Sequence, residues 1–204
     1  PQDHIYFTGG HPSTNEVLSF DRKSLTLTPR TPMLNARSQH SSVYTDGFLY
    51  VIGGKGRSQP LSECERFSVA DSKWEPIPPL PSALQDHSVI VQESTQTLYV
   101  VGGFKGSFDT NGIYELSLES LCWKQLSYTL PSKCSHISIF KPTGNSEDFF
   151  FVLNSKLYSW TPNSPPRKVK CLHSSIQSFN GPSYYSQGTI YCSNREGAVK
   201  KLEI

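Results

Sequence analysis

The sequence lacks long apolar runs and has no large excess of charge of either sign. Its longest apolar runs, residues 98–101 and 149–153, are only as long as a β-strand, whereas a membrane-spanning helix needs roughly 20 apolar residues. Lysine and arginine total 19 against 17 acidic residues, which gives a formal net charge of +2. Because this balance provides no general attraction to nucleic acid or anionic lipid, we expect neither a nucleic-acid partner nor a membrane span.

Cysteine is scarce, and its pattern is irregular. The five cysteines are odd in number and form no C-x-x-C pair, which argues against a disulfide framework or a zinc knuckle. The sequence also has no N-x-S/T sequon for N-glycosylation. We therefore expect free thiols in a reducing compartment and a cytoplasmic location.

Motifs of common enzymes are absent as well. The sequence contains no G-x-S-x-G nucleophile elbow, no P-loop and no H-E-x-x-H. The glycine-rich stretch at residues 53–56 is not a phosphate cradle, because a hairpin is expected after it and such a cradle needs a helix. We predict that the protein is not an enzyme and uses no cofactor.

Aromatic residues, proline and glycine are plentiful. The chain of 204 residues holds 11 Phe, 10 Tyr, 3 Trp, 15 Pro and 14 Gly, but a single Met. Aromatic residues favour strands, whereas proline and glycine favour turns. The composition therefore predicts an all-β fold of short strands and many turns.

An internal repeat is the strongest signal in the sequence. An apolar strand that ends in two glycines occurs at residues 5–10, 49–54 and 98–103, with starting points 44 and 49 residues apart. Two further copies, at residues 149–154 and 189–194, keep the apolar strand but have lost the glycine pair. A unit of this length provides four strands of about six residues, and it must stack on its neighbours to bury both faces.

Two more features repeat with the same period. A large apolar residue stands seven positions before a second bulky residue in the pairs Phe20 and Leu27, Phe67 and Trp74, and Leu116 and Trp123. A histidine recurs at spacings of 47 and 49 residues at His40, His87 and His136. We align these three histidines as one repeat position, and we expect the large rings of Trp74 and Trp123 to fill the wedge between adjacent units.

Together these residues resemble the Kelch repeat, whose pattern is R-x-x-H-S, then L-Y-x-x-G-G, Y-D and W. The match is best over residues 27–123 and weakest after Lys141. The resemblance implies a Kelch-type β-propeller, a ring of radial blades with four antiparallel strands each. We expect a single domain over residues 1–204, with repeat copies at approximately 4–33, 37–81, 84–131, 133–172 and 182–204.

The first and last copies are predicted to be incomplete. The chain opens at His4 on the second strand of a blade, and residues 198–204 correspond to a third strand. BTB-Kelch proteins, which this sequence resembles most, commonly begin on the second strand and have six blades. The chain is therefore expected to be part of a six-bladed ring, or a five-bladed ring with unusual closure. Unpaired strand edges would permit self-association.

The repeated histidines also suggest a metal site, because three imidazoles around a channel are a ligand set for zinc or copper. Radially spread strands would hold the rings too far apart for bonds of about 2 Å. We therefore predict a structural role for these residues and no metal site. The resemblance leaves an enzyme as the less favoured alternative, since Kelch-like propellers include copper oxidases and sugar-acid mutarotases.

The predicted partner surface lies on loops that follow the second strand of each blade. Residues 55–60 and 104–112 combine cations with aromatic rings, which are the usual anchors of protein interfaces. By resemblance, the connections between blades lie on the same face and add two further cations. The candidate partner-binding residues are Lys55, Arg57, Phe104, Lys105 and Phe108 from the loops, and Arg37 and Lys133 by resemblance.

The predicted function is that of a protein–protein interaction module, which binds a partner protein or a short peptide segment through this face. The resemblance to BTB-Kelch proteins suggests a substrate receptor of a cullin-RING ubiquitin ligase. The alternative is a cytoskeletal or structural assembly adaptor.

Overall fold

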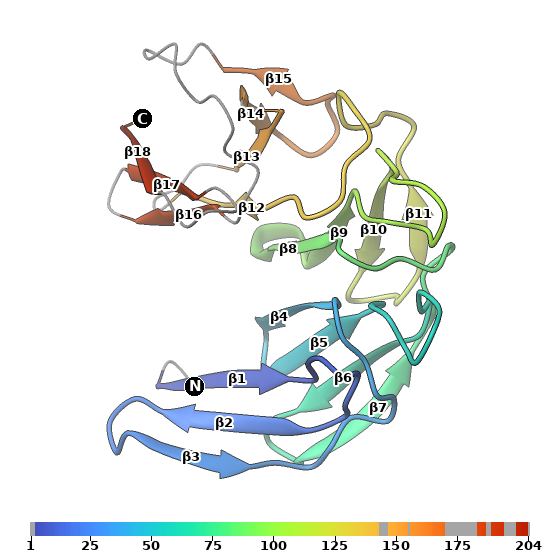
Figure 1. The fold of residues 1–204 in the computed structure, drawn as a ribbon, viewed down its shortest axis with the longest axis vertical. Coiled ribbons are helices and arrows are strands. Elements are labelled where there is room, and N and C mark those ends of the chain that lie inside the picture. Colours follow the sequence, from blue (N-terminus) through green and yellow to red (C-terminus); the bar gives the residue numbers. More distant parts are fainter. Residues whose placement is uncertain are drawn as a thin grey trace.

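The chain folds into antiparallel β-sheets that follow one another along an arc (Figure 1). The structure is a computed structural model that describes residues 3–142, 147–154, 156–169, 183–186, 189–193 and 199–203. Apart from a short 3-10 helix at Glu93–Thr95, the regular structure of these residues is β-strand. Within the same residues, no helix has the length and apolar character needed to cross a bilayer. The all-β prediction is confirmed.

Five sheets, called blades 1 to 5 here, contain the described strands. Blade 1 consists of β1 (His4–Thr8), β2 (Val17–Asp21) and β3 (Thr26–Pro29). Blade 2 consists of β4 (Ser41–Thr45), β5 (Phe48–Ile52), β6 (Cys64–Ser68) and β7 (Lys73–Ile77). Blade 3 consists of β8 (Ser88–Gln92), β9 (Thr97–Val101), β10 (Ile113–Ser117) and β11 (Trp123–Gln125). Blade 4 consists of β12 (Ile139–Phe140), β13 (Phe149–Leu153), β14 (Lys156–Trp160) and β15 (Arg167–Lys168). Blade 5 consists of β16 (Ser183–Ser186), β17 (Thr189–Ser193) and β18 (Val199–Glu203).

The strands of each blade are hydrogen-bonded in the order of the sequence. The first strands of neighbouring blades contact one another, β4 with β8, β8 with β12, and β12 with β16, which places them at the inner side of the arc (Figure 1). Blades 1 and 5 each have three described strands, which is the number that the sequence predicted for them. The ends of the predicted last strand, Ala198 and Ile204, lie outside the described residues.

Blades stack through positions that recur in the repeat. In blade 2 these positions are Leu49, Val51, Phe67 and Trp74, which form one buried cluster with residues of blade 1. The Trp74 ring lies 5.1 Å from the Phe67 ring, and its Nε1 donates a 2.8 Å hydrogen bond to the carbonyl of Thr31 in blade 1. The tryptophan thus fills the wedge between the two blades, as its size predicts.

The glycine pair permits the next blade to approach closely. Gly53 and Gly54 have φ angles of 52° and 101°, in the left-handed region that glycine adopts without strain. A Cβ atom on Gly53 would lie 2.7 Å from the carbonyl oxygen of Leu84 and 3.0 Å from the ring of His87. Gly53 is therefore required by contact with the connection to blade 3, whereas a Cβ atom on Gly54 would lie 2.7 Å from the carbonyl oxygen of Ser38 in the connection to blade 2.

Backbone hydrogen bonds correct the alignment of the fourth copy, at residues 133–172, by one residue. The amides of Gly10, Gly54 and Gly103 donate to the carbonyls of Arg37, Leu84 and Cys134, respectively. These three acceptors are therefore equivalent, and Lys133 is not the counterpart of Arg37.

The same shift removes His136 from the histidine position. The rings of His40 and His87 lie against Gly9 and Gly53, whereas Ile137 lies against Gly102. His136 is instead equivalent to Asp86, because both have φ near 55° and both donate a backbone hydrogen bond to the preceding blade. The alignment of His136 with the other two histidines was wrong because the connection between blades 3 and 4 holds an additional residue.

Candidate functional site

A cleft opens between blades 1 and 2 on the side of the loops. It has a volume of about 680 Å³ and is formed by the β1–β2 loop, the β3–β4 connection and the β5–β6 loop. Its lining consists of His11, Pro12, Ser13, Ala36, Ser38, Gln39, Lys55, Gly56 and Arg57. The predicted residues Lys55 and Arg57 both lie in this cleft.

Hydrogen bonds fix the main chain of the cleft. The amides of Lys55 and Ser38 donate to each other's carbonyl oxygens over 2.7 and 2.9 Å. The Ser13 hydroxyl lies 3.0 and 2.9 Å from the carbonyl oxygens of Lys55 and Gly56 and 3.1 Å from the Ser38 hydroxyl. Because the backbone under the cationic side chains is held in place, less conformational entropy is lost when a ligand binds.

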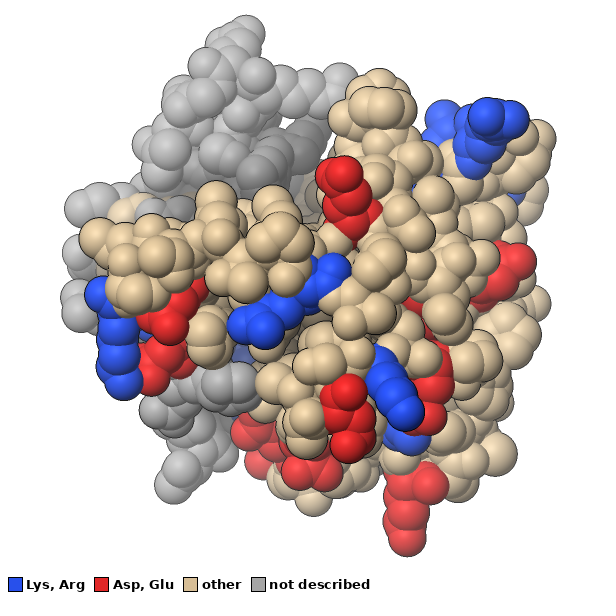
Figure 2. Space-filling view, turned by 90° about the horizontal axis from the view of Figure 1, so that it is seen from below, with Lys and Arg blue, Asp and Glu red and all other residues tan. Residues whose placement is uncertain are grey.

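The cationic side chains of the cleft form no ion pair with an acidic side chain among the described residues. No aspartate or glutamate lines it, and neither Lys55 nor Arg57 forms an ion pair with any described acidic side chain. On the side of the molecule in Figure 2, both basic and acidic side chains lie on the surface. The cleft therefore offers local rather than general attraction for an anionic group.

Arg37 does not reach the surface, so the prediction that it contacts a partner is wrong. Its side chain is fully buried, and its Nη2 lies 2.6 Å from Oε1 of the equally buried Glu65. Its Nη1 donates to the carbonyls of Gly53 and Glu63. A buried arginine needs such partners, and Arg37 therefore supports the floor beneath the loops.

The other predicted residues form a second cluster, between blades 3 and 4, called the Phe108 patch here. The Phe108 side chain is 52% exposed, and the Lys133 Nζ lies 5.4 Å from the centre of its ring. The amide of Lys105 donates to the carbonyl of Phe108, and Phe104 pairs with Gln85 through two backbone hydrogen bonds. The structure thus brings four of the predicted residues together.

The cleft and the Phe108 patch lie on one face. A Cβ atom on Gly106, in the loop of the patch, would lie 3.3 Å from the Pro60 ring in the loop of the cleft. The β5–β6 and β9–β10 loops are therefore in contact. A partner segment that crosses from blade 1 to blade 4 would pass over both groups of residues.

Sequence reasoning missed a row of polar side chains that crosses the blades beside the cleft. Asp86 accepts hydrogen bonds from the side-chain amides of Gln39 and Gln85, each over 3.1 Å. Its other carboxylate oxygen lies 3.2 Å from Nε2 of His136. Backbone bonds run through the same positions, from His136 to Asp86 and from Asp86 to Gln39. Only an alignment with the correct register could have placed these residues in one row.

The two histidines packed between blades, the buried His87 and the half-buried His40, remain neutral. Burial lowers the pKa of both His40 and His87 to about 4, and the Thr8 hydroxyl lies 2.8 Å from Nε2 of His40. Among the described residues, no group of three or more His, Cys, Asp and Glu side chains is placed to hold a metal ion.

A family model described as the KLHDC2/KLHL20/DRC7 Kelch-repeats domain matches residues 1–159. The chain belongs to this Kelch-repeat family. The resemblance inferred from the glycine pairs and the tryptophans is confirmed, and so is the Kelch-type β-propeller fold. Membership in this family supports a protein-interaction module.

Known proteins similar to this Kelch domain include cellular and viral ones. Kelch-like protein 35 of Mus musculus is 26% identical over 166 residues, which are 80% of this chain and 28% of that protein. Kelch-like protein 23 of Homo sapiens is 32% identical over 108 residues, 50% of this chain and 19% of that protein. Kelch repeat and BTB domain-containing protein 2 of Cowpox virus (strain GRI-90 / Grishak) is 25% identical over 119 residues, 56% of this chain and 21% of that protein. The chain thus spans less than a third of the length of these relatives.

A solved structure shares the fold. The structure of YjhT matches with a TM-score of 0.77 and covers 95% of this chain and 70% of that chain, at 14% sequence identity. At this identity the match establishes a common architecture alone.

Proposed function

We propose that this Kelch domain holds a short segment of a partner protein on its loop face, with Lys55 and Arg57 as anchors in the cleft between blades 1 and 2. The observation that carries the proposal is a cleft of about 680 Å³ whose two cations have no described acidic partner. Loops on a rigid scaffold are common binding sites, and arginine is a frequent anchor at protein interfaces. The Phe108 patch extends the same face and supplies an exposed ring beside a cation.

The proposal favours binding over catalysis. The Lys55 and Arg57 side chains offer charge and hydrogen-bond donors but no acid–base pair, and the neutral His40 and His87 rings are packed between blades. The name of one viral relative includes a BTB domain. We extend the proposal to a longer protein in which this domain acts in the cytoplasm as a substrate receptor of a cullin-RING ubiquitin ligase.

The experiment that tests the proposal compares two charge-matched double variants. Lys55→Ala with Arg57→Ala removes both cleft cations. Arg22→Ala with Lys73→Ala removes two exposed cations from the β2–β3 turn and the start of β7. Truncating an anchor typically costs about 2 kcal/mol, which is roughly thirtyfold in affinity. We expect the cleft variant, and not the control, to lose partners captured by the tagged chain and counted by quantitative mass spectrometry.

Both variants should unfold at the urea concentration of the parent chain, because none of the four side chains belongs to the core. Equal capture by the cleft variant and the parent would place the partner surface elsewhere and reject the proposal.

A further inference from the structure

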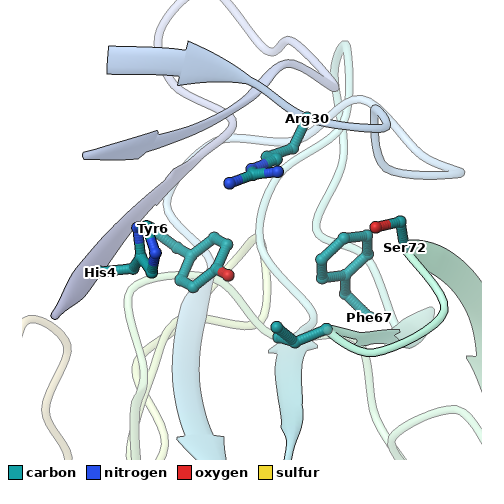
Figure 3. Close-up of a pocket in the computed structure, with 6 residues that line it drawn as sticks. His4, Tyr6, Arg30, Phe67 and Ser72 are labelled. Carbon is teal, nitrogen blue, oxygen red and sulfur yellow. The ribbon is translucent and has the colours of Figure 1, made fainter. Parts of the chain in front are cut away.

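A second, smaller pocket lies between blades 1 and 2 and shares no lining residue with the cleft. Its volume is about 180 Å³, and its lining is His4, Tyr6, Arg30, Phe67, Val69 and Ser72. Blade 1 contributes the first three residues and blade 2 the other three. Figure 3 shows the Tyr6 ring pointing across the pocket toward Phe67, with the Arg30 side chain extending over the space between them.

The repeat provides an internal comparison for this pocket. Arg30 and Ile77 are equivalent, because each stands beside the first residue of equivalent strands, Val17 of β2 or Cys64 of β6. Ser72 and Leu121 are equivalent, because each has a φ angle near 54° in the turn after β6 or β10. The positions that correspond to the pocket in the crevice between blades 2 and 3 are Phe48, Tyr50, Ile77, Leu116, Leu118 and Leu121.

All six of these counterparts belong to or pack on one hydrophobic cluster, which fills the crevice between blades 2 and 3. Between blades 1 and 2, His4, Arg30 and Ser72 replace Phe48, Ile77 and Leu121. These replacements exchange apolar volume for polar groups and leave a hollow. The pocket is therefore a property of these particular side chains and not of the repeat.

Arg30 is the cation that this pocket presents. Its Nε donates a 2.8 Å hydrogen bond to the Ser19 hydroxyl, which orients the guanidinium. No described acidic side chain forms an ion pair with it. His4, by contrast, has an acidic neighbour, because its Nε2 lies 3.9 Å from Asp21.

The other polar groups of the pocket are hydroxyls. Burial raises the pKa of Tyr6, an effect that Arg30 partly opposes, so its phenol stays protonated near neutral pH and can donate a hydrogen bond. The Ser72 hydroxyl lies in the lining, and the Thr31 hydroxyl donates to the Ser72 carbonyl over 2.9 Å. That bond joins the Arg30 segment to the turn of blade 2 and holds the two sides of the pocket together.

We propose that this pocket binds a small oxyanion group, a carboxylate or a phosphate, on the guanidinium of Arg30. The planar guanidinium matches both groups with parallel hydrogen bonds, and the Tyr6 and Ser72 hydroxyls add donors at the sides. A volume of 180 Å³ is below the range of roughly 300–1,000 Å³ for drug-sized ligands. It fits a small free anion or the end of one acidic side chain, and the site is separate from the proposed partner cleft.

The test follows the Arg30 Nε–H and the Ser72 amide of the intact chain by NMR during titration. The probes are sodium phosphate, sodium acetate and a capped peptide with one glutamate, against sodium chloride at the same ionic strength. We expect saturable shifts that the chloride blank does not give. Saturation by phosphate or acetate identifies a free anion as the ligand, and saturation by the peptide alone identifies a partner's side chain.

Three variants decide whether the pocket is the site. Arg30→Ile copies the residue of the next crevice, and Ser72→Leu fills the hollow with a residue that adopts the same φ at Leu121. Each should weaken binding by about tenfold or more, since hydrogen bonds to charged groups are the strong ones. Arg22→Ile, in the exposed β2–β3 turn, is the matched control. Shifts that stay linear with concentration, or equal weakening by Arg30→Ile and Arg22→Ile, would overturn the proposal.

Discussion

A histidine buried between two blades should make the fold sensitive to acid. Burial lowers the pKa of His87 from its ordinary 6.5 to about 4 in the folded chain. Between these two pH values the unfolded chain binds a proton that the folded chain does not. Folding stability is therefore complete above pH 6.5 and falls as the pH drops toward 4. His40 has the same shift from the same cause and adds to the effect.

Replacing His87 by isoleucine should remove its share of this acid sensitivity. Ile137 occupies the equivalent place in the next blade, so the position accepts the new side chain. We expect the parent chain to lose up to about 3 kcal/mol per buried histidine as the pH falls through this window, and His87→Ile to lose clearly less. Urea unfolding at about pH 5 and about pH 7 measures the difference.

The control for this prediction is His11→Gln, in the exposed β1–β2 loop, which should keep the parent's pH dependence. If His87→Ile and the parent lose the same stability on acidification, the His87 ring is not the group that titrates.

At the scale of elements, equivalent positions in two successive crevices between blades hold different kinds of side chain. Arg37 and Glu65 form a buried ion pair between the connection to blade 2 and strand β6. Leu84 and Tyr114 hold the equivalent places one blade later, within a hydrophobic cluster. Buried ion pairs are often replaceable by apolar groups, whereas removing one partner leaves an uncompensated charge.

This difference predicts a coupled pair of substitutions. Arg37→Leu alone should destabilise the chain by about 3–5 kcal/mol, because the Glu65 carboxylate stays buried without its cation. Arg37→Leu with Glu65→Tyr reproduces the pair of the next crevice and should lose less than the single variant. A double-mutant cycle in urea measures the coupling. Additive losses would show that the ion pair does not hold these elements together.

The elements themselves could be predicted from the sequence, but their exact register could not. In blade 2 the Gly53 and Gly54 pair, the apolar strand before it and Trp74 mark the repeat, because close approach and wedge packing restrict those positions to few residue types. The connection before His136 is not restricted in this way, and one additional residue there moved it out of alignment. Sequence also could not show that Arg37 is buried, since that depends on Glu65, 28 residues away.

The candidate site was predictable only as a set of loops. Lys55, Arg57 and Phe108 followed from the rule that irregular loops on a rigid scaffold carry binding residues. Ser13 and Gln39 line the cleft only because the β1–β2 loop, the β3–β4 connection and the β5–β6 loop meet there. No local sequence pattern encodes that meeting. The pocket around Arg30 depends on the loss of apolar volume at positions in two blades, and only the comparison of neighbouring crevices reveals it.

At the scale of the whole molecule, the exposed face of blade 1 carries apolar side chains at the positions that are buried between two blades elsewhere. Ile5, Phe7, Phe20 and Leu27 correspond to Leu49, Val51, Phe67 and Trp74, which are buried against the preceding blade. In blade 1, Ile5, Phe7 and Leu27 are 46, 53 and 59% exposed. Exposed apolar groups of this kind mark contact surfaces, so we expect this face to be covered in the working protein by a further blade or by a second copy.

Lysine substitutions on this face of blade 1 test whether the face is already covered within the chain. With Phe7→Lys and Leu27→Lys, the chain should keep its unfolding free energy within about 0.5 kcal/mol, and its concentration-dependent self-association should fall in sedimentation velocity. The matched variant, Val51→Lys with Trp74→Lys, places the same charges in a buried interface and should unfold the chain, because an unpaired buried charge costs several kcal/mol. Two results together would contradict the prediction: the parent chain stays monomeric at every concentration, and Phe7→Lys with Leu27→Lys costs several kcal/mol. The face would then already be covered within the chain.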